Sequence, residues 1–146
     1  MKHSEQFNKQ TQKFWDANPC GISDSWEHSK RVRYDYTDAY LLDYLNKDWF
    51  GDKNVLEVGC GQGIDASEII RFSKTYVGVD LSNQSLKIAR KECEQRNHIN
   101  ANLLFSAQDS ELLGIMTGAF DLVYSIGVLH HTANFKESVN EIHRVL

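Results

Sequence analysis

The amino-acid sequence predicts an α/β protein with a parallel sheet, and three observations support this. Short apolar segments alternate with amphipathic ones from residue 54 onward. A turn with three glycines, Gly59, Gly61 and Gly63, follows the first apolar segment, and an acid, Asp80, ends the second. Strands that alternate with helices form parallel sheets with right-handed crossovers. We therefore expect a sheet of this class, flanked by helices.

The expected strands are short apolar runs at 54–58, 75–80, 102–106 and 120–125. The expected helices of this region have apolar residues at helical spacing and cover about 63–72, 83–96 and 134–146. Ser82 stands at the N-cap position of the middle helix, whose inner face would carry Leu86, Ala89 and Cys93. The run at 121–126 predicts a strand that is buried on both faces.

Two further helices are predicted before the sheet, at about 4–16 and 29–47. The only proline, Pro19, lies in a turn signal between them. The second helix has apolar residues at helical spacing, which we expect to form a core stripe: Val32, Tyr36, Tyr40, Leu41, Tyr44 and Leu45. We predict that residues 1–50 form an N-terminal helical cap and that residues 51–146 form the α/β domain.

The composition excludes several function classes. The net charge is −4 without a block of Lys and Arg, which argues against nucleic acid as a partner. No apolar run reaches membrane-spanning length, and the N-terminus lacks an apolar leader segment. The cysteines, Cys20, Cys60 and Cys93, are odd in number and widely spaced. We expect no disulfide framework, no metal site, no membrane partner and a cytoplasmic location.

The glycine turn predicts a site for a nucleotide-type cofactor. Glycines let the backbone turn sharply and approach a ligand that a Cβ atom would block. An acid after the second strand, here Asp80, can accept hydrogen bonds from ribose hydroxyls. The alternative interpretation is an ordinary strand–helix turn that needs glycines for its geometry alone.

The spacing of the glycines distinguishes between cofactors. A dinucleotide fingerprint reads Gly-x-Gly-x-x-Gly and would require glycine at the position of Ile64. The third glycine instead falls one residue earlier, at Gly63, and Glu57 precedes the turn. These residues resemble the first motif of class I S-adenosylmethionine-dependent methyltransferases. Three further segments resemble the later motifs of that family in order, at 77–82, 105–111 and 120–131.

The resemblance covers residues 54–146 and implies a Rossmann-like fold with spatial strand order 3-2-1-4. Family members continue with three further strands, so the C-terminal half is expected to be incomplete, as in a truncated methyltransferase. The fourth strand would then lie at an apolar edge of the sheet. Because unpaired apolar edges associate, we expect a homodimer through this strand and the helix at 134–146.

The resemblance also implies roles for the residues of the first two motifs. Gly59, Gly61 and Gly63 would line the methionine part of S-adenosyl-L-methionine. Cys60, also expected at the cofactor site, would be a small side chain tolerated in the turn; a reactive thiol is the alternative. The helix that begins near Gly63 would offer free N–H groups to the carboxylate of the cofactor. Glu57 would hold its ammonium group; a capping or salt-bridge role is the alternative.

Residues after the second, third and fourth strands would complete the cofactor site. Asp80 would accept hydrogen bonds from both ribose hydroxyls, and Leu81 would pack against the adenine face. Asp109 would accept from the adenine amino group, beside the N–H of Ser110, or would be a solvated turn residue instead. Ser125 would face the cleft.

His130 and His131 are the candidate catalytic residues. Either imidazole could remove a proton from an oxygen or nitrogen nucleophile near neutral pH. The alternative is that one of them caps local backbone and the other is exposed.

The N-terminal segment at 14–21 resembles the lead-in of small-molecule methyltransferases, whose N-terminal helices cover the active site. In that region Arg33, Tyr34 and Tyr36 are candidates to touch cofactor or substrate; the alternative is that the tyrosines belong to a core stripe and that Trp15 serves packing.

These residues together predict a methyltransferase that uses S-adenosyl-L-methionine to methylate a small-molecule acceptor. One alternative is a non-catalytic module that binds S-adenosylmethionine, because strands that the family has are missing. The second alternative is a nicotinamide-binding domain, against which Ile64 argues.

Overall fold

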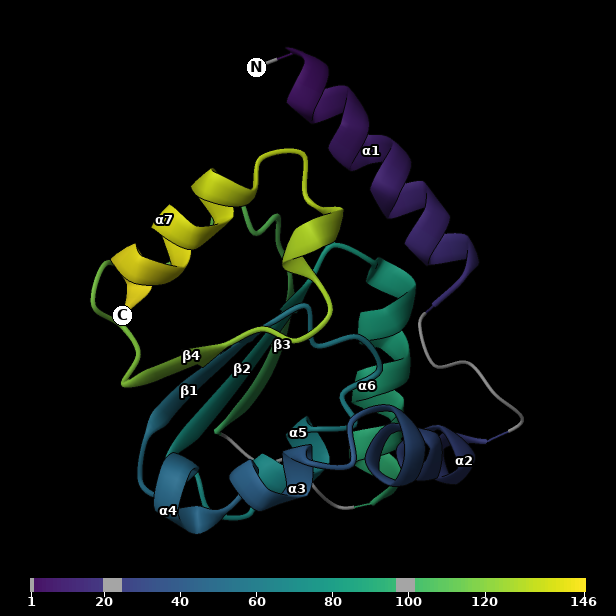
Figure 1. The fold of residues 1–146 in the computed structure, drawn as a ribbon, viewed down its shortest axis with the longest axis vertical. Helices are drawn as coiled ribbons and strands as arrows, with labels where there is room; N and C mark the ends of the chain where they lie inside the picture. The colour runs from purple at the N-terminus through teal and green to yellow at the C-terminus, as the bar shows by residue number, and fades with distance from the viewer. Residues whose placement is uncertain (1, 20–24, 97–101) are drawn as a thin grey trace.

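The computed structural model describes residues 2–19, 25–96 and 102–146. A four-stranded parallel sheet forms the centre of the molecule in the order β3-β2-β1-β4 (Figure 1). Its strands are β1 (Asn54–Val58), β2 (Thr75–Asp80), β3 (Leu103–Ala107) and β4 (Leu122–Tyr124). The predicted fold class and the predicted strand order are therefore confirmed.

Helical segments precede, connect and follow the strands. They are α1 (Lys2–Ala17), α2 (Trp26–Arg31), the π-helical segment η1 (Val32–Thr37), α3 (Leu41–Tyr44), α4 (Lys47–Phe50), α5 (Ala66–Ile69), α6 (Asn83–Gln95), the 3₁₀ turn η2 (Leu129–His131) and α7 (Phe135–Val145). The structure confirms the helices predicted at 4–16, 83–96 and 134–146 to within a few residues.

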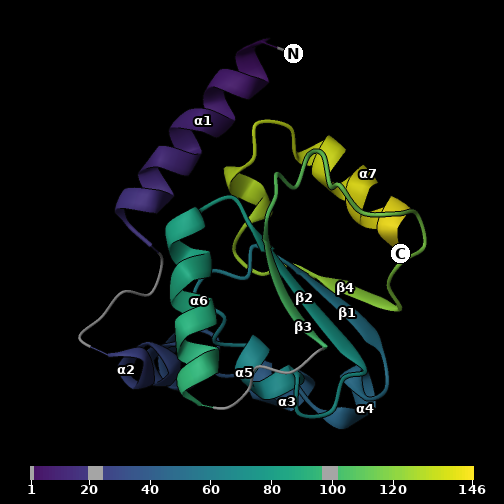
Figure 2. The ribbon, with the colours of Figure 1, turned by 180° about the vertical axis from the view of Figure 1, so that it is seen from behind.

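Alternate residues of β1 separate the core into two layers, because successive side chains of a strand point to opposite faces. Val55 belongs to the layer beneath α5 and α6, together with Tyr76 and Phe105. Leu56 belongs to the other layer, which α7 covers with Val145. Figures 1 and 2 show α7 on one face of the sheet and α5 and α6 on the other.

The N-cap of α6 follows the sequence prediction. The Ser82 hydroxyl accepts a hydrogen bond from the backbone N–H of Ser85 at 3.1 Å. Leu86, Ala89 and Cys93 are buried on the inner face of α6, as their spacing predicts. A capped helix with an apolar stripe therefore follows the second strand.

The single helix predicted at 29–47 is wrong. The chain forms α2, η1, α3 and α4 instead, and the last of these begins anew because the side chain of Asn46 accepts hydrogen bonds from the backbone N–H groups of Asp48 and Trp49. Tyr36 is 78% exposed. Tyr40 and Tyr44 are also exposed, so these tyrosines do not form a core stripe.

The helix predicted at 63–72 is also mostly absent, since α5 spans four residues. Gly63 has a φ of +70° and lies in the turn that leads to α5 rather than in a helix. A four-residue helix has too few aligned peptide dipoles for the predicted interaction with a cofactor carboxylate. The prediction that the N-terminus of this helix binds the carboxylate of the cofactor is therefore wrong.

The fourth strand is shorter and more exposed than predicted. Leu122, Val123 and Tyr124 are half-buried, and Asp121 is exposed. β4 nevertheless packs on both faces, since Leu122 and Tyr124 contact one core layer and Val123 contacts the other. Within the described residues it pairs with β1 on one side only.

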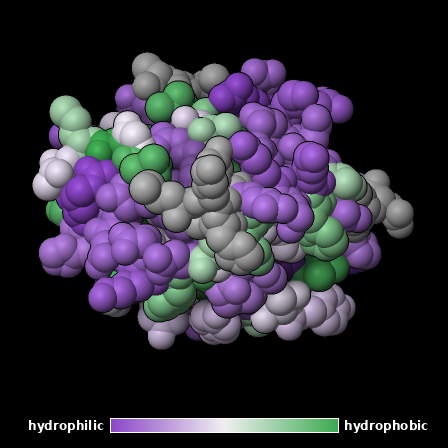
Figure 3. Space-filling model, turned by 90° about the horizontal axis from the view of Figure 1, so that it is seen from above, coloured by the Kyte–Doolittle hydropathy of each residue, from purple (hydrophilic) through white to green (hydrophobic). Residues whose placement is uncertain are grey.

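Helix α1 lies across the carboxyl ends of the strands, beside η2 and the start of α6 (Figures 1 and 2). Asp16 Oδ1 accepts hydrogen bonds from the Ser82 hydroxyl at 2.9 Å and the Gln84 N–H at 3.1 Å. Seen from the end where α1 begins, the surface is mostly hydrophilic, with hydrophobic residues in small groups (Figure 3). None of the helices within the described residues is long and apolar enough to cross a membrane.

Candidate functional site

A cavity of about 280 Å³ lies at the carboxyl ends of the strands, beneath α1. Ligands of open α/β sheets bind at this end, where the strand order reverses. The reversal here falls between β1 and β4, since β1 has β2 on one side and β4 on the other. Nine of the predicted site residues line the cavity: Glu57, Gly59, Cys60, Gly61, Asp80, Leu81, Asp109, Ser110 and His131.

The glycine turn forms one wall of the cavity. Gly59 has a φ of +83°, and a Cβ atom there would lie 2.1 Å from a methyl group of Val128. Gly61 has a φ of +50°, and a Cβ atom there would meet no atom within 4 Å. The first glycine therefore allows β1 and the segment after β4 to approach each other, and the second leaves backbone open toward a ligand.

Asp80 is held firmly at the end of β2. Its carboxylate accepts hydrogen bonds from the N–H of Gly61 at 2.9 Å and the N–H of Ser82 at 2.8 Å. Burial raises the pKa of Asp80, and these two backbone donors partly offset that rise. Each carboxylate oxygen retains a second lone pair, so the side chain can still accept hydrogen bonds from a ligand.

Asp109 connects the cavity to α1. One of its oxygens accepts a hydrogen bond from the side-chain amide of Asn8 at 2.6 Å, and the other accepts from the N–H of Glu111 at 2.9 Å. Ser110, beside it, lies with its hydroxyl 3.0 Å from that of Ser138. On the opposite side, Gln12 of α1 donates to the carbonyl oxygen of Leu81 at 3.0 Å.

Glu57 is only 4% exposed, although it lines the cavity. It accepts a hydrogen bond from the hydroxyl of Tyr76. Burial raises the pKa of Glu57 to about 8, and the nearby charge of Asp65 adds to the rise. The carboxyl group is therefore largely protonated at neutral pH.

This raised pKa predicts that folding stability falls as the pH rises. The folded protein holds a proton on Glu57 that the unfolded chain releases near pH 4.5, so the folded state binds more protons between about pH 4.5 and 8. We expect the free energy of unfolding to be lower at pH 8 than at pH 5 by at least about 1.4 kcal/mol, the equivalent of one pKa unit. Urea denaturation at both pH values measures this.

Glu57→Gln is the matched control, because glutamine cannot ionise. The variant should lose most of the decline between the two pH values. An equal decline in the variant and the original protein would show that other groups cause it.

Asp65 organises a second polar cluster, which the sequence did not reveal. It is 2% exposed and accepts hydrogen bonds from Arg33 Nε at 2.7 Å, Arg33 Nη2 at 2.6 Å and the hydroxyl of Tyr34 at 2.7 Å. Burial alone would lower the pKa of Arg33, but the hydrogen bonds and charge of Asp65 outweigh it and raise that pKa. Arg33 Nη1 also donates to Asp38 at 3.2 Å.

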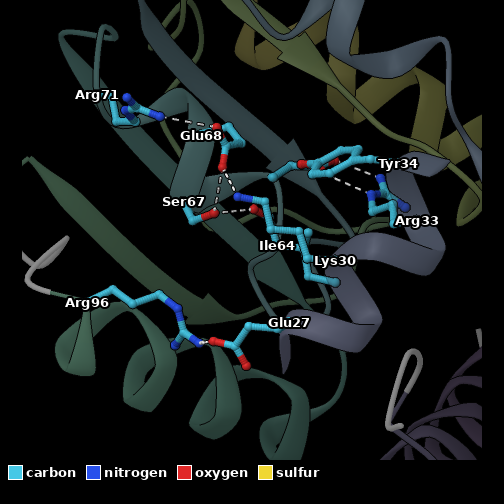
Figure 4. Close-up of polar contacts among 10 residues, drawn as sticks. Glu27, Lys30, Arg33, Tyr34, Ile64, Ser67, Glu68, Arg71 and Arg96 are labelled. Carbon is cyan, nitrogen blue, oxygen red and sulfur yellow. Dashed lines mark hydrogen bonds and ion pairs between the residues drawn. The ribbon is translucent and has the colours of Figure 1, made fainter. Parts of the chain in front are cut away.

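Arg33 lines the cavity, and Asp65 and Asp38 hold its guanidinium group. Figure 4 shows Lys30 of α2 directed toward Glu68 of α5, and Glu27 of α2 directed toward Arg96 at the end of α6. These two ion pairs join α2, which precedes Arg33, to α5 and to the end of α6. The cation therefore has a defined position at the edge of the cavity.

Three predicted site residues do not line the cavity. Gly63 lies under α6, where a Cβ atom would be 3.0 Å from that of Ala89, so its small size serves close packing. The Ser125 hydroxyl donates to the carbonyl oxygen of Val58 at 2.8 Å and fastens β4 to β1. His130 faces a second hollow between α1 and η2.

His131 lines both spaces. Its ring lies 5.3 Å from that of Trp15, edge to face, and 4.0 Å from that of His130, between centroids. Burial and the neighbouring His130 lower the pKa of His131, which favours the neutral imidazole.

Of the N-terminal candidates, Arg33 lines the cavity, and so does Trp15, for which packing was the expected role. Tyr34 is buried against Asp65, and Tyr36 points to solvent, so neither tyrosine lines it.

Cys60 faces the core as well as the cavity. It is 6% exposed, and a Cβ atom at Gly78 would lie 2.8 Å from its sulfur atom. Burial raises the pKa of the Cys60 thiol well above its usual value. A small apolar side chain in the turn, rather than a reactive thiolate, is what this environment favours.

Comparisons with known proteins identify the family. A model of the methyltransferase domain matches residues 56–146. A ubiquinone biosynthesis O-methyltransferase from Coxiella burnetii is 26% identical over 125 residues, which cover 86% of this chain and 48% of that protein. A phthiotriol/phenolphthiotriol dimycocerosates methyltransferase from Mycobacterium tuberculosis is 34% identical over 98 residues, which cover 66% of this chain and 34% of that protein.

Solved structures share the fold. The [4+2]-cyclase SpnF superposes with a TM-score of 0.76 at 24% identity, covering 95% of this chain and 56% of that chain. An S-adenosylmethionine-dependent methyltransferase from Mesorhizobium loti superposes with a TM-score of 0.60 at 22% identity, covering 73% of this chain and 47% of that chain.

The strand order, the glycine turn and the acid after the second strand define a class I S-adenosylmethionine-dependent methyltransferase fold. The chain belongs to the methyltransferase-domain family. It spans about half or less of the length of the two curated relatives described here.

Proposed function

We propose that this chain binds S-adenosyl-L-methionine in the cavity beneath α1 and transfers its methyl group to a small-molecule acceptor. The observation that carries the proposal is that one cavity joins the glycine turn, Asp80 and Asp109. These segments follow three different strands, and the fold alone brings them together. The family membership supports S-adenosylmethionine as the cofactor.

The residues of the cavity fit the parts of this cofactor. Asp80 is half-buried and held by two backbone donors, and it has free lone pairs for the two ribose hydroxyls. Leu81 offers apolar surface to the adenine ring. Asp109 can accept a hydrogen bond from the adenine amino group when the hydrogen bond from Asn8 is released. The open backbone at Gly61 leaves room for the methionine part.

Two ionisable side chains at the other end of the cavity fit the amino-acid group of the cofactor. Glu57 can accept from the ammonium, and Arg33 retains N–H donors for the carboxylate beyond those that Asp65 and Asp38 engage. The cluster of Asp65 thus orients the cation toward the ligand. An ammonium beside Glu57 would favour its ionised form, so binding should release a proton there.

The cofactor supplies an activated methyl group on a sulfonium, and the protein supplies positioning and a base. Holding the acceptor atom in line with that methyl group accounts for most of the rate enhancement. The neutral imidazole of His131, which lines the cavity, is placed to take a proton from the acceptor. His130 does not line the cavity but lines the second hollow, where we place the acceptor.

Turnover tests the catalytic part of this proposal against a non-catalytic binding module. The purified chain is incubated with methyl-labelled S-adenosylmethionine and a panel of hydroxylated and aminated aromatic and aliphatic acceptors. Transfer of label to one acceptor, lost in His131→Ala, is expected. Tight cofactor binding without transfer to any acceptor would favour the binding module.

We also propose that residues 1–146 associate as a homodimer through β4 and α7. Within the described residues β4 has a partner on one side only. Phe135 and Val139 of α7 are exposed, as is Leu146 directly after it, at a spacing that forms one stripe. Two copies related by a two-fold axis could pair these edges antiparallel.

Light scattering across a dilution series checks the dimer. The expected result is a mass of two chains that falls toward one chain on dilution. A clean monomer at micromolar concentration, with hydrogen exchange showing protected amides in β4, would contradict it. We further propose a cytoplasmic location, which the free thiols of Cys60 and Cys93 support.

A further inference from the structure

Helix α1 presents two adjacent stripes of side chains with different partners. Asn8, Gln12 and Asp16, four residues apart, contact the segments that follow β3 and β2. The neighbouring stripe consists of Phe7, Thr11, Phe14 and Trp15 and lines a second hollow, against His130 and His131. The first stripe therefore fixes the position of the second.

The second hollow, of about 540 Å³, is more open than the first and adjoins it. Thr11, Trp15 and His131 line both spaces. A molecule in the second hollow would therefore lie beside the cofactor cavity, with His131 between the two. These shared residues place the hollow next to the cavity.

The chemistry of the second hollow defines what it can hold. Its described lining contains three aromatic side chains and two imidazoles, together with Gln10 and Thr11, and no Lys, Arg, Asp or Glu. Phe7 is 41% exposed and Phe14 is 57% exposed, so their rings are available to a ligand. Aromatic rings that meet edge to face, as Phe14 and Trp15 do with centroids 5.0 Å apart, favour a further ring among them. A charged group would find no compensating charge there.

We propose that this hollow is the acceptor subsite and that it takes an uncharged, planar aromatic ring bearing a hydroxyl group. This inference rests on the proposed function and adds to it the class of acceptor. The ring lies among Phe7, Phe14 and Trp15, and the hydroxyl points past His131 toward the cofactor cavity. Gln10 and Thr11 offer hydrogen bonds to other substituents of the ring.

The transfer step in this arrangement balances without a further reactant. A C–O bond forms between the acceptor oxygen and the methyl carbon as the C–S bond breaks, and the electron pair of that bond stays on sulfur as a neutral thioether. The hydroxyl proton passes to an imidazole nitrogen of His131.

Calorimetry with three small probes tests the subsite in the full chain saturated with S-adenosylhomocysteine. The probes are naphthol, the saturated decahydronaphthol and the charged naphthalenesulfonate. We expect naphthol to bind most tightly, with the other two weaker by about five-fold or more. Phe7→Ala and Phe14→Ala should each weaken naphthol binding by a similar factor while leaving binding of S-adenosylhomocysteine within about two-fold, which also reports that the variants are folded.

Tyr40→Ala is the matched control, because Tyr40 is as exposed as Phe14, at 56%, and lines neither space. It should leave naphthol binding unchanged. Absence of heat from S-adenosylhomocysteine would overturn the proposed function itself. Binding of S-adenosylhomocysteine without binding of naphthol, equal binding of the sulfonate, or naphthol binding that is indifferent to Phe7 and Phe14 would overturn the acceptor subsite alone.

Discussion

Asp80→Ala is expected to weaken binding of S-adenosylmethionine by about 1.5–3 kcal/mol, the usual contribution of hydrogen bonds to a charged group. The carboxylate would accept from the ribose hydroxyls, and it also holds the N–H groups of Gly61 and Ser82 at 2.9 and 2.8 Å. Its removal therefore costs both the contact and the shape of the glycine turn. Calorimetric titration with S-adenosylhomocysteine measures the loss.

Two further variants make this result interpretable. Asp80→Asn retains an oxygen acceptor but lacks the charge, so its loss should lie between those of the original protein and the alanine variant. His130→Ala should leave cofactor affinity nearly unchanged, because His130 lines only the second hollow. A loss in His130→Ala as large as in Asp80→Ala would show that the cofactor lies elsewhere in the cleft.

Asp65→Ala is expected to produce the largest loss of stability, about 3–5 kcal/mol in the free energy of unfolding. Removal of one partner of a largely buried ion pair takes most of the compensation from the other charge. Arg33, whose side chain is 23% exposed, would keep only the longer contact with Asp38 at 3.2 Å. Here the guanidinium of Arg33 would lose two hydrogen bonds of 2.7 and 2.6 Å, and the buried hydroxyl of Tyr34 would lose its acceptor. Urea denaturation followed by circular dichroism gives the value.

Glu68→Ala is the control for Asp65, because both acids belong to the segment after the glycine turn and accept from a cation of the N-terminal region. Glu68 pairs with Lys30, whose side chain is 35% exposed, so the pair should contribute about 0–1 kcal/mol. Equal losses in the two variants would mean that burial does not increase the contribution of the Arg33–Asp65 pair to the free energy of unfolding.

The sheet was predictable because its signals are local. Each strand is a short apolar run. The glycine turn follows the first strand and an acid ends the second, and the topology rules then leave few possible strand orders. Ser82 was predicted to cap the start of α6, and its hydroxyl accepts the capping hydrogen bond from the N–H of Ser85. The same reasoning placed Gly59, Gly61, Asp80 and Asp109 at one cavity.

The errors arise where tertiary contacts override helical spacing. Tyr36, Tyr40 and Tyr44 have the period of a core stripe, yet the chain forms several short helices here, and the side chain of Asn46 caps the start of α4. Asp65 gave no signal, because an acid two residues after Gly63 fits an exposed helix start equally well. The contacts of Asn8, Gln12 and Asp16 were not predicted, because their partners lie more than 60 residues away in the chain.

The central claim is that the glycine turn and Asp80 form a site for S-adenosylmethionine rather than for a dinucleotide. Isothermal titration of the purified chain with S-adenosylmethionine, S-adenosylhomocysteine and NAD, in separate experiments at neutral pH, tests it directly. The predicted result is saturable binding of the first two ligands with one site per chain and no heat from NAD. Tight binding of NAD with no heat from S-adenosylmethionine would contradict the account.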